Sequence, residues 1–205
     1  MGRRGRFIVL EGPDKSGKST QALALVRELR RRGRTVVHTR EPGGTALSEG
    51  IRELLLDPSQ KVCALAEVLL YEASRAQHTQ QLILPALRSG KTVLSERYAL
   101  ATLAYQGGAR GLPMRLVRRL NRIATSGLRP DLTLVLDIPD ARFRTRDPGR
   151  RHDRLERESM AFRRRVRDAY RRLSRTEPRT LLIDSDRPPE AVRTDILRRV
   201  LRLYR

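Results

Sequence analysis

The hydrophobic positions of the chain repeat in two different patterns. Short runs of apolar or β-branched residues predict β-strands, and they lie at residues 7–10, 35–38, 92–95, 132–136 and 180–183. Between these runs the apolar residues recur with a helical period, for example within residues 19–32, which Gly33 follows. Strands that alternate with helices predict an α/β fold, in which a largely parallel sheet has helices on both faces.

Polar or glycine-rich residues come directly after each predicted strand. In an open parallel sheet the ligand binds beyond the carboxyl ends of the strands, so these residues are candidates for a site. They are Glu11 with residues 12–19, residues 40–44, residues 96–98, Asp137 and residues 184–186. The sequence therefore predicts that this edge of the sheet is the binding edge.

The loop after the first predicted strand carries the most specific motif. Residues 12–19 read Gly-Pro-Asp-Lys-Ser-Gly-Lys-Ser and match the pattern G-x-x-x-x-G-K-[ST] between a strand and a helix. That order aims backbone N–H groups and the positive end of the helix at one point, where phosphate oxygens fit. Lys18 can reach the β- and γ-phosphates of a nucleotide, and the Ser19 hydroxyl can join the ligands of Mg²⁺. The loop predicts binding of a nucleoside triphosphate.

Three further groups can supply the other half of a phosphoryl-transfer site. Tyr71 and Arg75 are i, i+4 neighbours on a predicted helix, where a ring can stack on a base and a guanidinium can bond its edge. On spacing alone, a half-buried tyrosine beside a surface arginine is the simpler interpretation. Arg97 follows the third strand and suits a phosphate, while Glu96 can hold Mg²⁺ through water. Arginines around the loop 147–152 can neutralise the charge of a transferring group.

The charge of the chain raises the question of a nucleic-acid partner. The formal net charge is +21, but only four of the 44 basic residues are lysines, and the arginines are dispersed over predicted helices. Aromatic residues make up 4% of the chain and tryptophan is absent, so platforms for stacking bases are few. We therefore expect a solvated basic surface and no nucleic-acid partner, although such a surface can bind polyanions in a salt-dependent way.

Length and cysteine content narrow the class of protein further. A chain of 205 residues is expected to form one domain with a sizeable core. The single cysteine, Cys63, excludes an internal disulfide, and we expect it to be a small buried residue. There is no signal peptide and no apolar run of membrane-spanning length, so we expect a cytoplasmic protein without membrane contact.

Several motifs together resemble the thymidylate kinase family, in the same order and with the same spacing. Besides the phosphate loop, the distinctive ones are Arg-Glu-Pro-Gly-Gly at 40–44 and Tyr-Gln-Gly-Gly at 105–108. The others are Tyr71…Arg75…Gln77, Glu96-Arg97-Tyr98, Arg-Pro-Asp-Leu-Thr at 129–133 and Asp-Arg-Leu-Glu at 153–156, so the resemblance covers nearly the whole chain. It implies ATP-dependent phosphorylation of dTMP to dTDP with Mg²⁺. It also implies a P-loop NTPase-type fold with a five-stranded parallel sheet, a short lid at about residues 146–154 and a homodimer.

The resemblance also assigns roles to individual residues of this sequence. Catalytic charge would come from Lys18, Arg97, Lys15, Arg150 and Arg151. ATP would contact Gly12, Pro13, Asp14, Lys15, Ser16, Gly17, Lys18, Ser19, Thr20 and Arg146, with residues 184–188 forming part of the adenine pocket. The acceptor dTMP would contact Asp14, Arg40, Tyr71, Arg75, Arg97, Tyr105 and Gln106, and Mg²⁺ would contact Ser19 and Glu96. Whether Lys15 or the lid arginines carry the catalytic charge stays open.

Three positions depart from the usual family pattern. Glu96 stands where an aspartate is usual, and Ala101 lacks a hydroxyl often found there. Glu72 replaces a small apolar residue beside Tyr71, so we expect it to add negative charge near the base site. These changes keep an alternative open, a kinase of the same fold that acts on another pyrimidine monophosphate. The net charge of +21 keeps a second one open, an ATP-regulated nucleic-acid-binding protein. A nucleotide binder without catalytic activity is a third.

Overall fold

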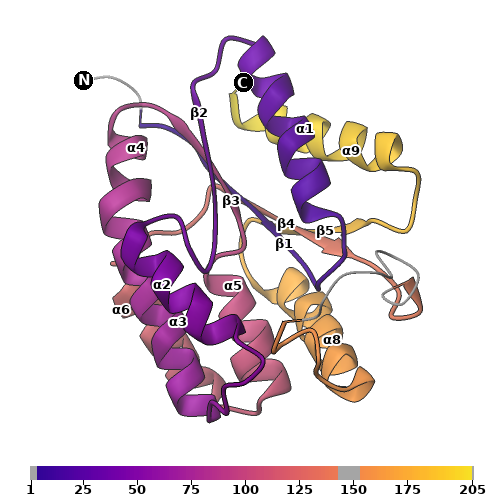
Figure 1. Cartoon of the computed structure of the whole chain (residues 1–205). Coiled ribbons are helices and arrows are strands. Elements are labelled where there is room, and N and C mark those ends of the chain that lie inside the picture. The colour runs from indigo at the N-terminus through magenta and orange to yellow at the C-terminus, as the bar shows by residue number, and fades with distance from the viewer. Residues whose placement is uncertain (1–3, 143–152, 205) are drawn as a thin grey trace.

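The computed structural model describes residues 4–142 and 153–204 of the chain (Figure 1). One parallel sheet of five strands, in the order β2-β3-β1-β4-β5, forms its centre. The strands are β1 (Phe7–Glu11), β2 (Val36–Arg40), β3 (Thr92–Glu96), β4 (Leu132–Asp137) and β5 (Thr180–Asp184). The predicted α/β fold with a five-stranded parallel sheet is confirmed.

Helices cover both faces of this sheet. Figure 1 shows α1 and α9 together on one face and α4, α5, α6 and α8 on the other, with α2 and α3 beside them. The α-helices are α1 (Lys18–Arg31), α2 (Ala46–Leu56), α3 (Ala64–His78), α4 (Leu84–Arg88), α5 (Ala99–Thr102), α6 (Met114–Ala124), α8 (Met160–Thr176) and α9 (Pro189–Leu201). The π-helical segments η1 (Thr79–Ile83) and η2 (Leu103–Ala109) and the short 3₁₀ helix η3 (Arg202–Tyr204) complete the described elements.

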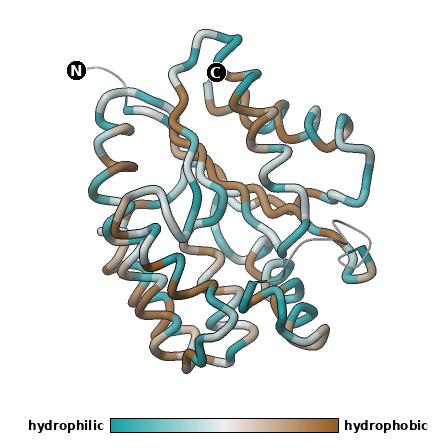
Figure 2. Tube along the Cα trace, in the orientation of Figure 1, coloured by the Kyte–Doolittle hydropathy of each residue, from teal (hydrophilic) through white to brown (hydrophobic). Residues whose placement is uncertain are grey.

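The central strand β1 shows how the sequence builds the core. Successive side chains of a strand point to opposite faces, so Ile8 and Leu10 pack under α1 and α9, while Phe7 and Val9 pack on the other side. All four side chains are fully buried. A strand that is buried on both faces reads as one continuous apolar run, and Figure 2 shows these hydrophobic strands inside the more polar helices.

The second strand begins and ends later than the apolar pattern predicted. It covers Val36–Arg40 instead of residues 35–38, because its parallel ladder with β3 continues to the pair Arg40 and Glu96. Its polar Thr39 is nevertheless buried, since its hydroxyl is hydrogen-bonded to His78 Nε2 at 2.7 Å. The apolar pattern ended before Thr39 because this residue is polar. Its hydrogen bond to His78 allows it to be buried in the strand, and such a bond cannot be seen in the sequence.

The expectation that Cys63 is buried is wrong. The residue is exposed, because it occupies the position just before the first turn of α3, where the chain enters the helix from a loop.

The Tyr-Gln-Gly-Gly motif lies on η2, which packs closely against α8. A Cβ added at Gly108 would stand 2.4 Å from the Cβ of Ala169, so only glycine allows this approach. The close contact lets α8 deliver Tyr170 to the edge of the sheet where β1 and β3 end.

Candidate active site

The phosphate loop joins β1 to α1 at the carboxyl edge of the sheet. Gly12, Lys15 and Gly17 have φ angles of 136°, 61° and 90°, so the loop turns through left-handed backbone at three points. A Cβ at Gly12 would lie 2.4 Å from the carbonyl oxygen of Leu136. The loop wraps around the Lys18 ammonium, which donates to the carbonyl oxygens of Gly12 at 3.1 Å and Pro13 at 2.7 Å.

Lys18 is nine-tenths buried inside this loop. Burial and the neighbouring Arg97 guanidinium lower the pKa of Lys18 to about 7, while Asp14 and Glu11 act in the opposite direction. Burial therefore disfavours the charged form of Lys18, and a bound phosphate would stabilise it.

An open groove, which we call the donor groove, runs along the phosphate loop toward α9. Its lining comprises residues 15–21 together with Ser185, Arg187, Pro189 and Val192. The segment 184–188, which was predicted to form part of the adenine pocket, therefore lies beside the phosphate loop.

At the end of β4, Asp137 pairs with Arg167 of α8, with a distance of 2.7 Å from Nε to Oδ1.

Ser19 and Glu96, the predicted metal ligands, are in direct contact. The Ser19 hydroxyl donates to Glu96 Oε2 at 2.5 Å, and His38 Nε2 is 3.0 Å from Glu96 Oε1. Burial opposes ionisation of Glu96, but the bonds from His38 and Ser19 outweigh it and lower the pKa. The longer side chain of Glu96 therefore reaches the loop with its carboxylate held by His38.

The side chains of Ser19 and Glu96 fit the ligand preference of Mg²⁺. A hydroxyl and a carboxylate are the hard oxygen ligands that Mg²⁺ prefers, with phosphates and water completing the octahedron. Within residues 4–142 and 153–204 no group of three or more His, Cys, Asp or Glu side chains forms a separate metal site.

Arg97 connects the turn after β3 to the phosphate loop. Its backbone is left-handed, with φ of 69°, and its amide donates to the carbonyl oxygen of Leu10 at 2.8 Å. Nη1 donates to the carbonyl oxygen of Gly12 at 2.9 Å, and Nη2 pairs with Asp14. The Tyr105 hydroxyl, 3.2 Å from Nη2, donates to Asp14 Oδ2 at 3.0 Å. Burial opposes ionisation of Asp14, but Arg97 and Lys18 outweigh it and lower its pKa.

The fully buried carboxylate of Glu11 is linked to Arg97 through Tyr170. Glu11 Oε1 accepts from the backbone amides of Tyr98 at 2.8 Å and Ala101 at 3.2 Å, and Oε2 accepts from the Tyr170 hydroxyl at 2.8 Å. The Tyr170 hydroxyl in turn lies 3.2 Å from Arg97 Nη1. The sequence placed Glu11 at the edge of the sheet but gave no sign of this role, because its partners come from the turn after β3, from α5 and from α8.

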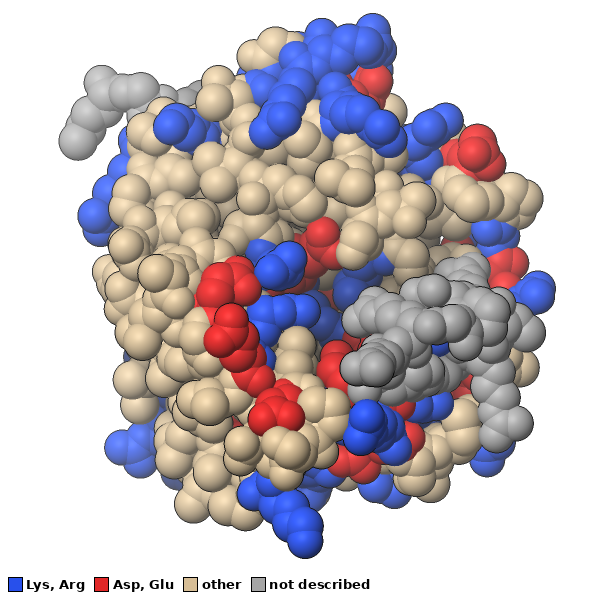
Figure 3. Space-filling model, viewed as in Figure 1, with Lys and Arg blue, Asp and Glu red and all other residues tan. Residues whose placement is uncertain are grey.

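A second pocket, which Arg97 and Asp14 line, brings together most of the predicted acceptor residues. Its lining is Asp14, Glu41, Pro42, Arg52, Leu56, Tyr71, Arg97, Ala101, Thr102, Tyr105, Gln106, Asp153 and Leu155. Figure 3 shows Lys and Arg side chains at the centre of this hollowed face, with Asp and Glu side chains around them. We call this space the acceptor pocket. Arg52 was missed by the sequence analysis, since it belongs to none of the motifs.

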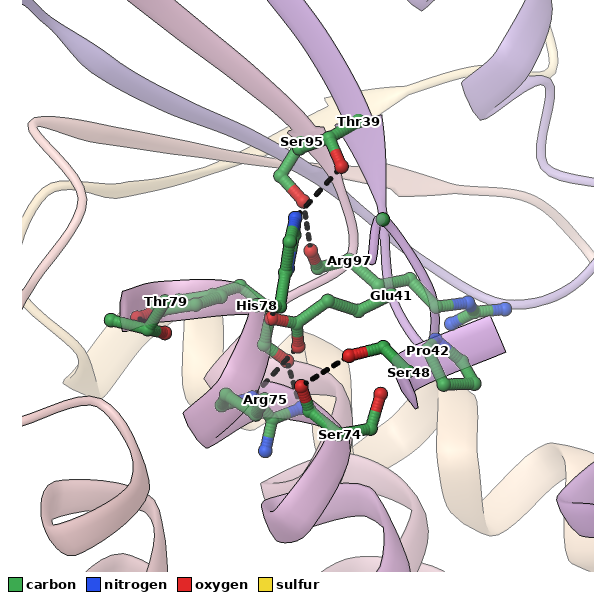
Figure 4. Close-up of polar contacts among 12 residues, drawn as sticks. Thr39, Glu41, Pro42, Ser48, Ser74, Arg75, His78, Thr79, Ser95 and Arg97 are labelled. Carbon is green, nitrogen blue, oxygen red and sulfur yellow. Dashed lines mark hydrogen bonds and ion pairs between the residues drawn. The ribbon is translucent and has the colours of Figure 1, made fainter. Parts of the chain in front are cut away.

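Arg75 is not part of this lining. It is 1% exposed, and its guanidinium donates to Glu41 Oε2 at 2.8 Å, Glu72 Oε1 at 2.9 Å and the carbonyl oxygen of Tyr98 at 3.1 Å. Figure 4 shows Glu41 next to both Arg75 and His78, whose Nδ1 is 3.0 Å from Glu41 Oε1. The structure directs these donors to acceptors within the protein. The contact between Arg75 and a base therefore stays a prediction.

Glu72 and Arg40 were both expected near the acceptor nucleotide, but neither lines the acceptor pocket. Glu72 was expected to add negative charge near the base site, but it is buried, lies outside the lining of the acceptor pocket and pairs with Arg75. Arg40, a predicted dTMP contact, is exposed and pairs with Glu49 at 3.1 Å.

The predicted lid residues Arg146, Arg150 and Arg151 lie outside the described residues. The described end of that segment, Arg154, is held by Glu67, with Nη1 at 2.6 Å from Glu67 Oε2. Glu67 is fully buried and was also missed by the sequence analysis, although it lies one helical turn before Tyr71.

The phosphate loop lies at the edge of a parallel sheet, and a cationic turn links it to a second pocket. This arrangement is that of a P-loop nucleotide kinase. Comparison with known proteins agrees with this class. The sequence model of the thymidylate kinase family matches residues 10–196, and the chain belongs to that family.

Its similarity to curated and solved members extends over almost the whole chain. It is 47% identical to a thymidylate kinase of Halothermothrix orenii, and the alignment covers 96% of this chain and 97% of that protein. It is 49% identical to one of Pseudomonas putida, with 94% and 93% covered. The crystal structure of thymidylate kinase from Ehrlichia chaffeensis superimposes with a TM-score of 0.77 at 31% identity, covering 97% of this chain and 99% of that one.

Proposed function

We propose that this protein transfers the γ-phosphoryl group of ATP to the 5′-phosphate of dTMP and releases dTDP and ADP. Family membership over nearly the whole chain supports this assignment and gives no support to the nucleic-acid-binding alternative. The observation in the structure that carries it is the contact of Arg97 with both Gly12 and Asp14. Through this contact, one cation lies between the donor loop and the acceptor pocket.

The chemistry requires positioning and charge neutralisation rather than a strong base. The acceptor phosphate is already an anion, so one of its oxygens attacks the γ-phosphorus while the bond to the β-phosphate oxygen breaks. Lys18 and the loop N–H groups bind the donor phosphates, and Arg97 holds the acceptor phosphate in line with them. Mg²⁺, bound near Ser19 and Glu96, would neutralise charge on the β- and γ-phosphates.

Tyr71 and Gln106 would bind the nucleoside of the acceptor. Tyr71 lines the acceptor pocket from α3, where its ring can stack on a base, and Gln106 lines it from η2. Tyr105, which is bonded to Asp14, would border the sugar.

We also propose that the enzyme is a homodimer formed through α2, α3 and α6. These helices pack in series and carry exposed large apolar side chains, namely Leu47, Leu54, Leu65, Leu69, Leu116 and Ile123. An exposed apolar surface of this kind is typical of a protein–protein interface. A second copy of the chain is the occupant that the family resemblance implies.

No helix among the described residues is long and apolar enough to cross a membrane. A cytoplasmic location remains a proposal, supported by a cysteine content that does not require an oxidising compartment.

A coupled assay of ADP release over a panel of monophosphates tests the function. We expect turnover with ATP, Mg²⁺ and dTMP, with dUMP and dCMP as poorer acceptors. Lys18→Ala should abolish turnover, because the donor phosphates lose their buried cation. Turnover of another monophosphate in preference to dTMP would instead support a kinase with a different acceptor, and ATP binding without turnover would support the non-catalytic alternative.

A further inference from the structure

The buried carboxylate of Glu67 is surrounded by hydrogen-bond donors from other elements. Its Oε1 accepts from Gln106 Nε2 at 2.8 Å and Arg110 Nε at 3.1 Å. Its Oε2 accepts from Arg110 Nη2 at 3.1 Å and Arg154 Nη1 at 2.6 Å. Burial opposes ionisation of Glu67, but the bonds from Arg110 and Gln106 and the charge of Arg154 outweigh it and lower the pKa.

These bonds join several walls of the acceptor pocket. Glu67 is on α3, one turn before Tyr71, and Gln106 is on η2. Arg154 stands between the lining residues Asp153 and Leu155, and its Nε donates to the carbonyl oxygen of Leu55 at 2.8 Å. The carboxylate therefore holds the walls that surround a bound nucleoside.

The same carboxylate fixes which way the Gln106 amide faces. An ionised carboxylate can only accept hydrogen bonds, so it selects the orientation in which the Gln106 NH₂ group faces it. Gln106 also lines the acceptor pocket, and Oε1 is then the atom of its amide that can meet a ligand. The pocket consequently offers an acceptor at this point and not a donor.

Gln106 lies at the base end of the pocket. Its partner Glu67 shares a face of α3 with Tyr71, whose ring is placed to stack on a base, whereas Arg97 and Asp14 mark the phosphate end. Ala101 offers no polar side chain there, and the Thr102 hydroxyl already accepts from Arg75 Nη1 at 2.8 Å. Gln106 supplies the carboxamide of this lining, next to the end of the pocket where a base can stack on Tyr71.

We propose that Glu67 is a positioning residue for base selectivity, which holds Gln106 so that its Oε1 accepts a hydrogen bond from a ring N–H of the acceptor base. A pyrimidine whose ring N3 carries a proton, as in thymine, satisfies this atom. Cytosine, whose N3 carries a lone pair, opposes it. The inference rests on the proposed function, since it names the group that the acceptor must present.

Glu67→Gln tests the orientation directly. Arg154 Nη1 and Arg110 Nη2 only donate, so they would take the new amide oxygen at the Oε2 position. The new NH₂ group would then face Gln106, and Arg110 Nε would lose its acceptor. Gln106 would then turn its own NH₂ group into the pocket, against the N–H of thymine. We expect kcat/KM for dTMP to fall by roughly 10- to 100-fold, as for an unpaired buried polar group, with the KM for ATP unchanged. The preference should shift toward dCMP.

The N3-methyl derivative of dTMP separates positioning from a purely structural role. This derivative lacks the N–H, so wild type should use it poorly and Glu67→Gln should cause no further loss. An equal loss for dTMP and its N3-methyl derivative would overturn the inference, and so would an unchanged kcat/KM for dTMP. A 3′-deoxy analogue of dTMP, which keeps N3–H, should still show the full loss. If that analogue alone escaped the loss, the bond would go to the sugar and the inference would be wrong.

Three control variants complete the experiment. Glu158→Gln makes the same chemical change on the outer side of Arg110, 2.5 Å from Nη1, and should leave base selectivity unchanged. Glu67→Asp keeps an acceptor-only carboxylate and should keep the preference for dTMP over dCMP, so loss of that preference would contradict the inference. If Glu67→Gln does not fold, Gln106→Leu should give the same loss for dTMP and none for its N3-methyl derivative. Failure of wild type to phosphorylate dTMP would instead refute the proposed function, independently of these variants.

Discussion

Arg97 forms an ion pair with Asp14 and thereby ties the turn after β3 to the phosphate loop. The same guanidinium donates to the carbonyl oxygen of Gly12 at 2.9 Å. Its left-handed backbone, with φ of 69°, is a conformation that a non-glycine residue adopts at a cost. The fold accepts that cost at a point where a cation faces both substrates of the proposed reaction.

Replacing Arg97 should impair binding of the acceptor and transfer together. For Arg97→Ala we expect a raised KM for dTMP and a lowered kcat, with kcat/KM reduced on the order of 10²- to 10³-fold, because a fixed charge is lost beside the transferring group. Steady-state kinetics with each substrate varied in turn measure this, and the KM for ATP should change far less. Near-normal kinetics with dTMP would show that Arg97 contributes neither to acceptor binding nor to phosphoryl transfer.

The buried Lys18 predicts proton uptake when ATP binds. Its pKa is about 7 in the nucleotide-free protein, because burial and Arg97 disfavour the charged form. Phosphate oxygens favour the charged form, so ATP must raise this pKa. At about pH 8 the free protein holds Lys18 mostly neutral and should take up close to one proton on binding, whereas at about pH 6 it is already charged and should take up little.

Isothermal titration calorimetry in two buffers of different ionisation enthalpy measures this uptake. The apparent binding enthalpy should differ between the buffers at the higher pH and converge at the lower one. Lys18→Met should give the same apparent binding enthalpy in both buffers at the higher pH as well as at the lower pH. Equal enthalpies in wild type at the higher pH would show that Lys18 is already charged before ATP binds.

Local patterns in the sequence were sufficient to predict the fold and to locate the phosphate loop. The apolar runs located each strand of the sheet, and the phosphate-loop pattern located Lys18 and Ser19, because both signals lie within a few consecutive residues. Resemblance to a family added Tyr71 and Gln106, which the structure places in one pocket.

The missed residues have partners that are distant in sequence. Glu67 is 39 residues from Gln106, and Glu11 is 159 residues from Tyr170. The position of Glu11 after the first strand made it a candidate, but no local pattern identifies the partners of either carboxylate. The interpretation of Glu72 failed for the same reason. A charged residue beside Tyr71 suggested charge near the base, but helix α3 directs it toward Arg75 inside the protein.

The buried Arg75 should contribute strongly to stability. Arg75→Ala would leave the carboxylates of Glu41 and Glu72 buried without their cation, and breaking a buried pair in this way costs about 3–5 kcal/mol. Arg40→Ala is the matched control, since it removes an arginine from the exposed pair with Glu49 and should cost about 0–1 kcal/mol. Urea unfolding followed by circular dichroism gives both free energies. A cost for Arg75→Ala as small as that of the control would show that the buried network contributes no net stability.

The proposed homodimer predicts that one charge on α6 separates the subunits. Ile123 is 66% exposed, and a glutamate there would place a charge in an apolar interface, where it cannot be solvated. Analytical ultracentrifugation should find wild type as a dimer and Ile123→Glu as a monomer at micromolar concentration. Leu23→Glu is the control, because Leu23 is 53% exposed on α1, across the sheet from α6, and should leave the dimer intact. Dissociation by both variants, or by neither, would place the interface elsewhere on the protein.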